Sequence, residues 1–198
     1  MKDRKLTKKE FREVKSIQNQ TTLKNKKIFI FRTEKSGGLA IKKWNIILIQ
    51  RKVGKMSINQ LKFLLAHELA HIEFKYTLSE KEVKNIYKAS NRIKGMINET
   101  MCDLRAAKLV KLSDKEMEEY FERMSTDVNL CYKYGYFTAD IRKRFVEEYL
   151  KEGFNKESFK ERFVSNYSVF KEYGIDIQEI NLDDFRKYLD YYFDEFVI

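Results

Sequence analysis

Apolar side chains recur along this chain first at helical spacing and then in short runs typical of strands. Phe11, Val14 and Ile17 follow the capping-box pattern Thr7-Lys8-Lys9-Glu10, which predicts an amphipathic helix over residues 7–19. Three short runs rich in β-branched and aromatic residues follow it, with Ser36-Gly37-Gly38 interrupting the pattern. We expect these runs to be strands over residues 27–33, 39–41 and 46–49.

A long apolar stretch comes next, and from there to the C-terminus the pattern is helical. Ser57 is a suitable N-cap for a nearly continuous apolar helix over residues 57–75. Further helices are expected over residues 79–111, from 113 onward, and over 127–134, 138–152, 156–172 and 181–196. The sequence thus predicts the α+β class, with a small twisted N-terminal sheet of about three strands packed on the 57–75 helix, and an all-helical C-terminal half. We expect a core over residues 1–112 and a helical region over 113–198.

Composition adds limits on the class of protein. The hydrophobic content of 43% is enough for a packed core, and no apolar run is long enough to span a membrane. The charged N-terminus lacks the apolar segment of a secretory signal, and the two cysteines, Cys102 and Cys131, suit a reducing cytosol. We therefore expect a cytoplasmic protein. The absence of proline, with abundant Lys, Ile, Asn and Tyr, is typical of an AT-rich bacterial or phage genome.

Charge is distributed unevenly along the chain. Residues 1–56 hold 17 basic and 4 acidic residues, whereas the remaining 142 hold 23 and 26. A basic segment of this kind can bind nucleic acid or an acidic partner, or can simply form a solvated face. The composition leaves these readings open.

The 57–75 helix contains both histidines of the chain, in the order His67-Glu68-Leu69-Ala70-His71. Residues four apart share one helix face, so both imidazoles can point at one cation, while Glu68 is offset by about 100° and can reach water bound to it. This HExxH spacing is that of a zinc metallopeptidase helix. The alternative is a pair of solvent-facing histidines, which the apolar flanks disfavour.

A catalytic zinc needs a third protein ligand, and no further histidine exists. Glu73 lies about 200° round the helix from His71 and cannot share its face. Glu99 is the best candidate, with Asp103 one turn later accepting the outer N–H of a ligand histidine. The alternatives are that both acids are exposed or paired with Arg92 or Arg105, or that Cys102 is the ligand.

These residues together resemble a known family. The HELAH motif followed 28 residues later by Glu99-x-x-x-Asp103 resembles the gluzincin metallopeptidases, and the order of parts is most similar to the ImmA/IrrE family. The resemblance extends over about residues 27–150 and includes the segments 99–110 and 130–145. It implies a zinc-dependent endopeptidase that hydrolyses a peptide bond in a regulatory protein, such as a transcriptional repressor of a phage or other mobile element.

The residues supply a mechanism for that reaction. One Zn²⁺ per chain, held by His67, His71 and Glu99, would activate a water molecule, and Glu68 would act as general base. Candidates for stabilising the oxyanion are Tyr76, Tyr87, Arg92 and Arg105. We expect the strand formed by Asn45, Ile46, Ile47, Leu48 and Ile49 to offer an edge to an extended substrate.

A second function must be weighed against this one. Residues 127–152 are similar to a helix-turn-helix, in which Thr138 would begin a second helix carrying Arg142, Lys143 and Arg144. With the basic N-terminal quarter, this would make a DNA-binding or protein-binding regulator whose metal site is structural or vestigial. Three glutamates on the same helix, Glu147, Glu148 and Glu152, disfavour phosphate contacts, so nucleic acid is the less favoured partner.

Overall fold

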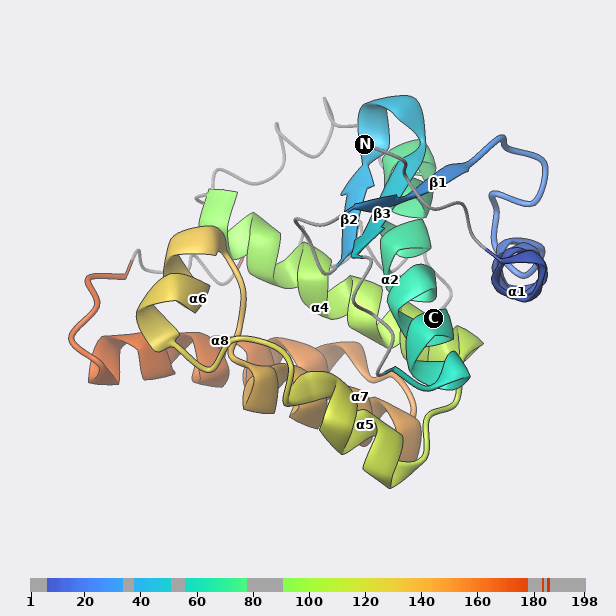
Figure 1. Cartoon of the computed structure of the whole chain (residues 1–198). Helices are drawn as coiled ribbons and strands as arrows, with labels where there is room; N and C mark the ends of the chain where they lie inside the picture. The colour runs from blue at the N-terminus through green and yellow to red at the C-terminus, as the bar shows by residue number, and fades with distance from the viewer. Residues whose placement is uncertain are drawn as a thin grey trace. The chain divides into compact units, whose positions relative to one another are not determined.

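The computed structural model describes residues 7–33, 38–50, 56–77 and 91–177, together with Asp183 and Phe185 (Figure 1). The chain forms two compact units. The first comprises Met1–Thr77 with Arg105–Tyr120, and the second comprises Leu78–Leu104 with Phe121–Ile198. This division by contacts differs from the functional boundary expected at residue 112, which stays a prediction.

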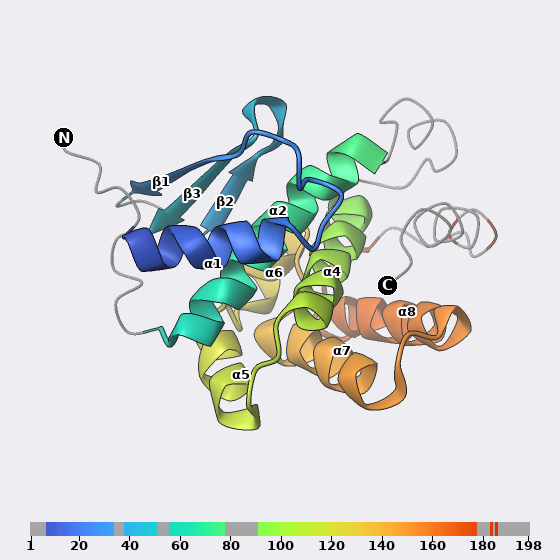
Figure 2. The same cartoon turned by 90° about the vertical axis from the view of Figure 1, so that its right-hand side faces the viewer.

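The first unit begins with a capped helix and continues into a mixed sheet (Figure 2). Helix α1 (Lys8–Gln18) starts at Thr7, which accepts the Glu10 N–H at 3.2 Å while the Glu10 carboxylate accepts the Thr7 N–H at 2.7 Å. The strands are β1 (Phe29–Thr33), β2 (Gly38–Ile41) and β3 (Ile46–Gln50), with a 3₁₀ turn, η1 (Lys42–Trp44), between the last two. The predicted α1 helix and three-stranded sheet are therefore confirmed.

Strand β3 lies between the other two strands. It pairs in parallel with β1 and antiparallel with β2, giving the order β1-β3-β2. The expectation that residues 45–49 present a free edge is therefore wrong, because both sides of Ile46–Ile49 are hydrogen-bonded to neighbouring strands. Asn45 is not in the strand; it ends η1 in the left-handed region at φ 54°. Within the described sheet, the edges are β1 and β2.

The two faces of the sheet differ in what covers them. Ile47 and Ile49 of β3 are fully buried on the face that meets helix α2 (Ile58–Thr77), and Gly38 of β2 shares this face through its register with Ile49. The opposite face carries Phe29, Phe31 and Leu39, which are 41%, 43% and 48% exposed. One face thus supports the histidine helix, and the other leaves apolar side chains at the surface.

Helix α2 is anchored at its N-terminus by a hydrogen-bonded network. Ser57 accepts the Gln60 N–H at 3.1 Å, and the Gln60 side chain accepts the Ser57 N–H at 3.0 Å, so the predicted N-cap is confirmed. Glu116 of α5 (Asp114–Phe121) accepts the Ser57 hydroxyl at 2.5 Å, and its backbone carbonyl accepts from the Gln60 side chain at 2.9 Å. These contacts lower the pKa of Glu116, chiefly through the Ser57 hydroxyl.

The second unit is helical around an aromatic core. Its elements are the first part of α4 (Asn91–Leu109), then α6 (Val128–Tyr134), α7 (Ala139–Glu152) and α8 (Lys156–Glu172). Gly135 ends α6 at φ 74°, and a side chain there would meet the Arg92 carbonyl oxygen at 3.0 Å. Buried aromatic rings fill the interior. The ring centre of Phe163 lies 5.0 Å from those of Phe137 and Phe185.

The helical half agrees with the sequence prediction wherever the structure describes it, so the α+β fold class is confirmed. The expected helix over 79–111 is described from Asn91 onward. Of the expected helix over 181–196, only Asp183 and Phe185 lie within the described residues, and both are helical.

Candidate metal centre

The two histidines of α2 face each other within the first unit. His67 and His71 are 5% and 7% exposed, and their Nε2 atoms lie 3.2 Å apart with the rings at 83°. A tetrahedral ion that binds two imidazoles at about 2.0–2.1 Å separates the two nitrogens by about 3.3 Å. The pair therefore has the nitrogen separation that chelation of one ion requires.

Glu68 is buried beside these histidines, on the side of α2 that meets the sheet. It is 5% exposed, and a Cβ atom built on Gly38 of β2 would lie only 2.4 Å from its Oε1 atom. The strand approaches the carboxylate so closely because residue 38 has no side chain. Glycine at position 38 thus allows β2 to pack directly against Glu68, the residue expected to act as general base.

Glu73, rejected as a ligand on helical geometry, has a different partner. Its carboxylate accepts two hydrogen bonds from Arg105, at 2.9 and 3.1 Å, and one from the Thr22 backbone N–H at 2.8 Å. Glu73 is 1% exposed, so the guanidinium compensates its buried charge. Arg105, one of the expected oxyanion stabilisers, is therefore held in an ion pair with Glu73.

The two acids of α4 share a cation in the second unit. Arg142 of α7 donates from Nε to Asp103 at 2.7 Å and from a terminal nitrogen at 3.0 Å, and it lies 3.5 Å from Glu99. Asp103 is fully buried and the Glu99 side chain is 17% exposed. The expected roles of Glu99 as ligand and Asp103 as histidine partner stay predictions. The arginine that pairs with these acids is thus Arg142, not Arg92 or Arg105 as the sequence suggested.

Cys102 provides another donor on α4. It is fully buried, and His67, His71 and Cys102 form a group that could hold a metal ion. The sequence offered this thiol as an alternative third ligand. Imidazole and thiolate donors suit zinc and several other transition metals.

The remaining oxyanion candidates are described only in part. Arg92 is exposed, and its guanidinium lies 5.0 Å from the ring centre of Tyr132 in the second unit. Tyr76 lies in α2, but its side chain is outside the described residues, as is all of Tyr87.

The basic residues expected to contact DNA differ in their exposure and in their ion-pair partners. Thr138 is the N-cap of α7, as predicted. However, Arg142 is 8% exposed and holds Asp103, and Lys143 lies 3.5 Å from Glu147. Arg144 alone of the three is exposed. The buried guanidinium is therefore not on a phosphate-binding surface.

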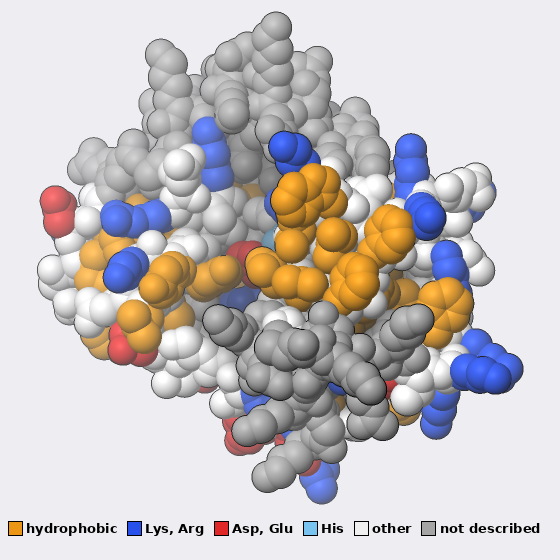
Figure 3. All heavy atoms as spheres, turned by 45° about the horizontal axis from the view of Figure 1, so that its top comes forward, with side chains coloured by type: hydrophobic (Ala, Val, Ile, Leu, Met, Phe, Trp, Pro, Cys, Tyr) orange, Lys and Arg blue, Asp and Glu red, His pale blue; other side chains and the backbone are white. Residues whose placement is uncertain are grey.

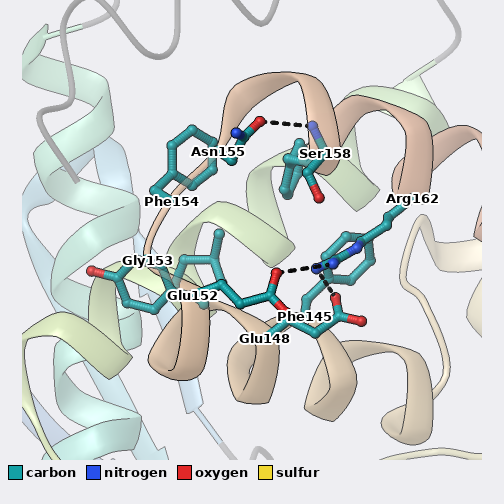
Figure 4. Close-up of a pocket in the computed structure, with 11 residues that line it drawn as sticks. Phe145, Glu148, Glu152, Gly153, Phe154, Asn155, Ser158 and Arg162 are labelled. Atoms are coloured by element: carbon teal, nitrogen blue, oxygen red, sulfur yellow. Dashed lines mark hydrogen bonds and ion pairs between the residues drawn. The ribbon is translucent and has the colours of Figure 1, made fainter.

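A small pocket in the second unit is too small to bind a substrate (Figure 4). It lies at the junction between the end of α7 and the start of α8. Its volume is about 30 Å³, little more than a water molecule needs. Its arginine, Arg162, is already paired with Glu148 at 2.5 Å and Glu152 at 3.3 Å, and Asn155 caps α8 by accepting the Ser158 N–H at 3.0 Å. These contacts are those of a helix junction.

Comparison with known proteins identifies no relative of this chain. No family model matches the chain, and neither a curated protein nor a solved structure is significantly similar to it. Among the described residues, no helix has the length and apolar character needed to cross a membrane.

Proposed function

We propose that this protein is a zinc-dependent endopeptidase that cuts a regulatory protein, with His67 and His71 as metal ligands and Glu68 as general base. The observation that carries the proposal is the 3.2 Å separation of the two Nε2 atoms on a buried helix, with a buried carboxylate next in sequence. Two imidazoles that face each other in an apolar interior need a proton or a cation between them. A divalent ion would also explain why Glu68 stands beside them.

The third ligand would come from α4. The ion pair between Arg105 and Glu73 ties α4 to α2, and Cys102 lies one turn before Arg105 on the same continuous helix. Glu99 lies almost one further turn away, so both residues are candidates. Glu99 would give the carboxylate expected of a gluzincin-like site, and Cys102 would give a thiolate.

In the proposed reaction, the chain's own groups move the proton and place the substrate. A bound metal would supply Lewis acidity and lower the pKa of its water. Glu68 would take the proton from that water and deliver it to the leaving amine. Because the Arg105 guanidinium is held by Glu73, Tyr76, Tyr87 and Arg92 remain the candidates for stabilising the oxyanion.

The edge available to an extended substrate is β2 rather than β3. Strand β2 pairs only with β3 among the described strands, and its Gly38 lies against the Glu68 carboxylate. We therefore propose that a substrate segment adds to β2, where backbone hydrogen bonds would bring a scissile peptide toward Glu68.

A DNA-binding regulator with a structural metal is the weaker alternative. Its expected reading helix keeps Arg142 buried against Asp103 and Lys143 beside Glu147. Salt-dependent binding of duplex DNA that survives removal of the metal would favour the regulator over the peptidase.

Elemental mass spectrometry of the purified protein is the first test. We expect about one zinc per wild-type chain, its loss in His67→Ala, and its loss in one of Glu99→Ala and Cys102→Ala. The exposed Glu122 and the buried Cys131 provide matched controls, Glu122→Ala and Cys131→Ala, that should keep the metal. A wild-type protein that stays metal-free after zinc is offered would refute the proposal, because the histidines would then share only a hydrogen bond.

Activity is tested by comparing cells that express wild type with cells that express Glu68→Gln. New protein N-termini, identified by mass spectrometry, should arise only with the wild type, while both proteins keep their zinc. New N-termini that are equally abundant with both proteins would show that Glu68 is not the base.

A further inference from the structure

A groove runs along the edge of β1 that pairs with no other described strand, at the end of the β1-β3-β2 order away from Gly38. It has a volume of about 490 Å³ and lies between α1 and β1. Its lining includes Ile30 and Phe31 of β1, Ile28 just before the strand, and Phe11 of α1. The volume is within the range of ligand-binding pockets. Figure 3 shows apolar side chains gathered at the surface over the sheet, with lysine and arginine side chains around them.

The strand presents its backbone to this groove. Phe29 donates its N–H to the Asn45 carbonyl at 2.9 Å, and β1 runs parallel to β3 from Phe29 through Thr33. In a parallel pair, alternate residues bond to the partner strand, so the N–H and C=O of Ile30 point to the opposite side. Among the described strands none pairs with that side of β1. An extended chain could therefore add there as a further strand.

The charge at the groove is positive. Lys8, Arg12 and Lys15 of α1 line it, and none of the described lining residues is acidic. The two glutamates of α1 are engaged elsewhere, Glu10 with Arg32 and Glu13 with Lys62. Lys15 donates a hydrogen bond to Gln18 at 2.9 Å, so Lys8 and Arg12 are the cations that we expect to meet an acidic occupant.

We propose that the β1 groove binds an extended acidic peptide in which apolar and acidic residues alternate. In a strand, successive side chains point to opposite sides, so alternate residues can enter the apolar floor while the others meet Lys8 and Arg12. A peptide fits better than single-stranded nucleic acid, because its backbone can pair with the N–H and C=O of Ile30 and because Lys27 already lies 5.0 Å over the Phe29 ring. The groove is a second binding site, and it does not depend on the proposed hydrolysis.

Fluorescence anisotropy tests this site with three probes. They are a short labelled peptide alternating glutamate with valine or phenylalanine, the same peptide with N-methylated backbone amides, and labelled oligothymidylate. We expect the acidic peptide to bind and the N-methylated peptide to fail, because backbone pairing requires the amide hydrogens. A wild-type protein that does not bind the acidic peptide, or that binds only oligothymidylate, would overturn the proposal.

Charge reversals in the full chain test where the peptide binds. Lys8→Glu with Arg12→Glu removes two cations from the groove, and Lys9→Glu with Lys24→Glu makes the same change in net charge at exposed positions outside it. The first double variant should raise the dissociation constant about tenfold or more, and the second about twofold at most. Equal weakening by both variants would mean diffuse attraction to a basic protein and would overturn the site.

Discussion

Replacing Arg142 by methionine should destabilise the second unit strongly. The change removes two hydrogen bonds, at 2.7 and 3.0 Å, from the fully buried Asp103 carboxylate. It also removes the positive charge that lies 3.5 Å from Glu99. Removing one partner of a buried ion pair costs about 3–5 kcal/mol, because the other charge stays in a poorly solvated place. With a urea m-value of about 2 kcal/mol per molar, the unfolding midpoint should fall by about 2 M.

Urea unfolding followed by circular dichroism measures this loss. Arg144→Met is the matched control, since Arg144 is exposed on the same helix and its replacement should change the free energy of unfolding by less than about 0.5 kcal/mol. In the double variant with Asp103→Asn, the loss should be smaller than the sum of the two single losses. A cost below about 1 kcal/mol for Arg142→Met would refute the view of this pair as a buried, coupled ion pair.

Three further predictions follow from local geometry. Gly38→Ala places a methyl group 2.4 Å from Glu68 Oε1, so we expect turnover to fall about 100-fold while zinc content is unchanged. Hydrogen bonds lower the pKa of Glu116, so the ionised carboxylate stabilises the fold at pH values above the ordinary pKa of glutamate. This stabilisation is lost as the pH falls through the lowered pKa. Glu116→Gln should therefore reduce the loss of stability on acidification. Burial raises the pKa of Cys131, so iodoacetamide should alkylate it more slowly in the folded protein than in urea.

Each of these has a direct check. Loss of zinc from Gly38→Ala would mean that the strand supports the ligands rather than the base. Glu122→Gln, at an exposed position just beyond the helix that carries Glu116, is the control and should change the acid dependence of stability much less. Equal alkylation of Cys131 in folded and unfolded protein would show that the thiol is accessible.

The parts of the fold that sequence predicted are those determined by neighbouring residues. Thr7 and Glu10, three residues apart, form the expected capping box, and Ser113 and Glu116, also three residues apart, pair in the same way where a helix was expected to begin. The facing of His67 and His71 is equally local, since one helical turn separates them. The helix pitch places both side chains on one face, so the sequence alone could predict that the two imidazoles lie together.

Strand order could not be obtained in that way. The parallel pairing of β1 with β3 joins residues 17 positions apart, such as Phe29 and Ile46, across the intervening β2. The unbroken apolar run Ile46–Ile49 predicts a strand with buried side chains, but it does not say which strands pair with its two edges. The partners of Asp103 and Glu73 are also distant, at 39 and 32 residues, and several arginines could have served.

The division of the first unit into two separate stretches of sequence has a consequence for its synthesis. Residues 105–120 supply Arg105 to Glu73 and Glu116 to Ser57, so helix α2 lacks both contacts while the ribosome is making the segment between them. The apolar side chains of α2 therefore lack these packing partners until residue 120 has left the ribosome. A nascent chain with such exposed apolar surface is prone to aggregate or to recruit a chaperone. For the same reason, a fragment that stops at residue 77 would contain both histidines but not the residues that anchor their helix.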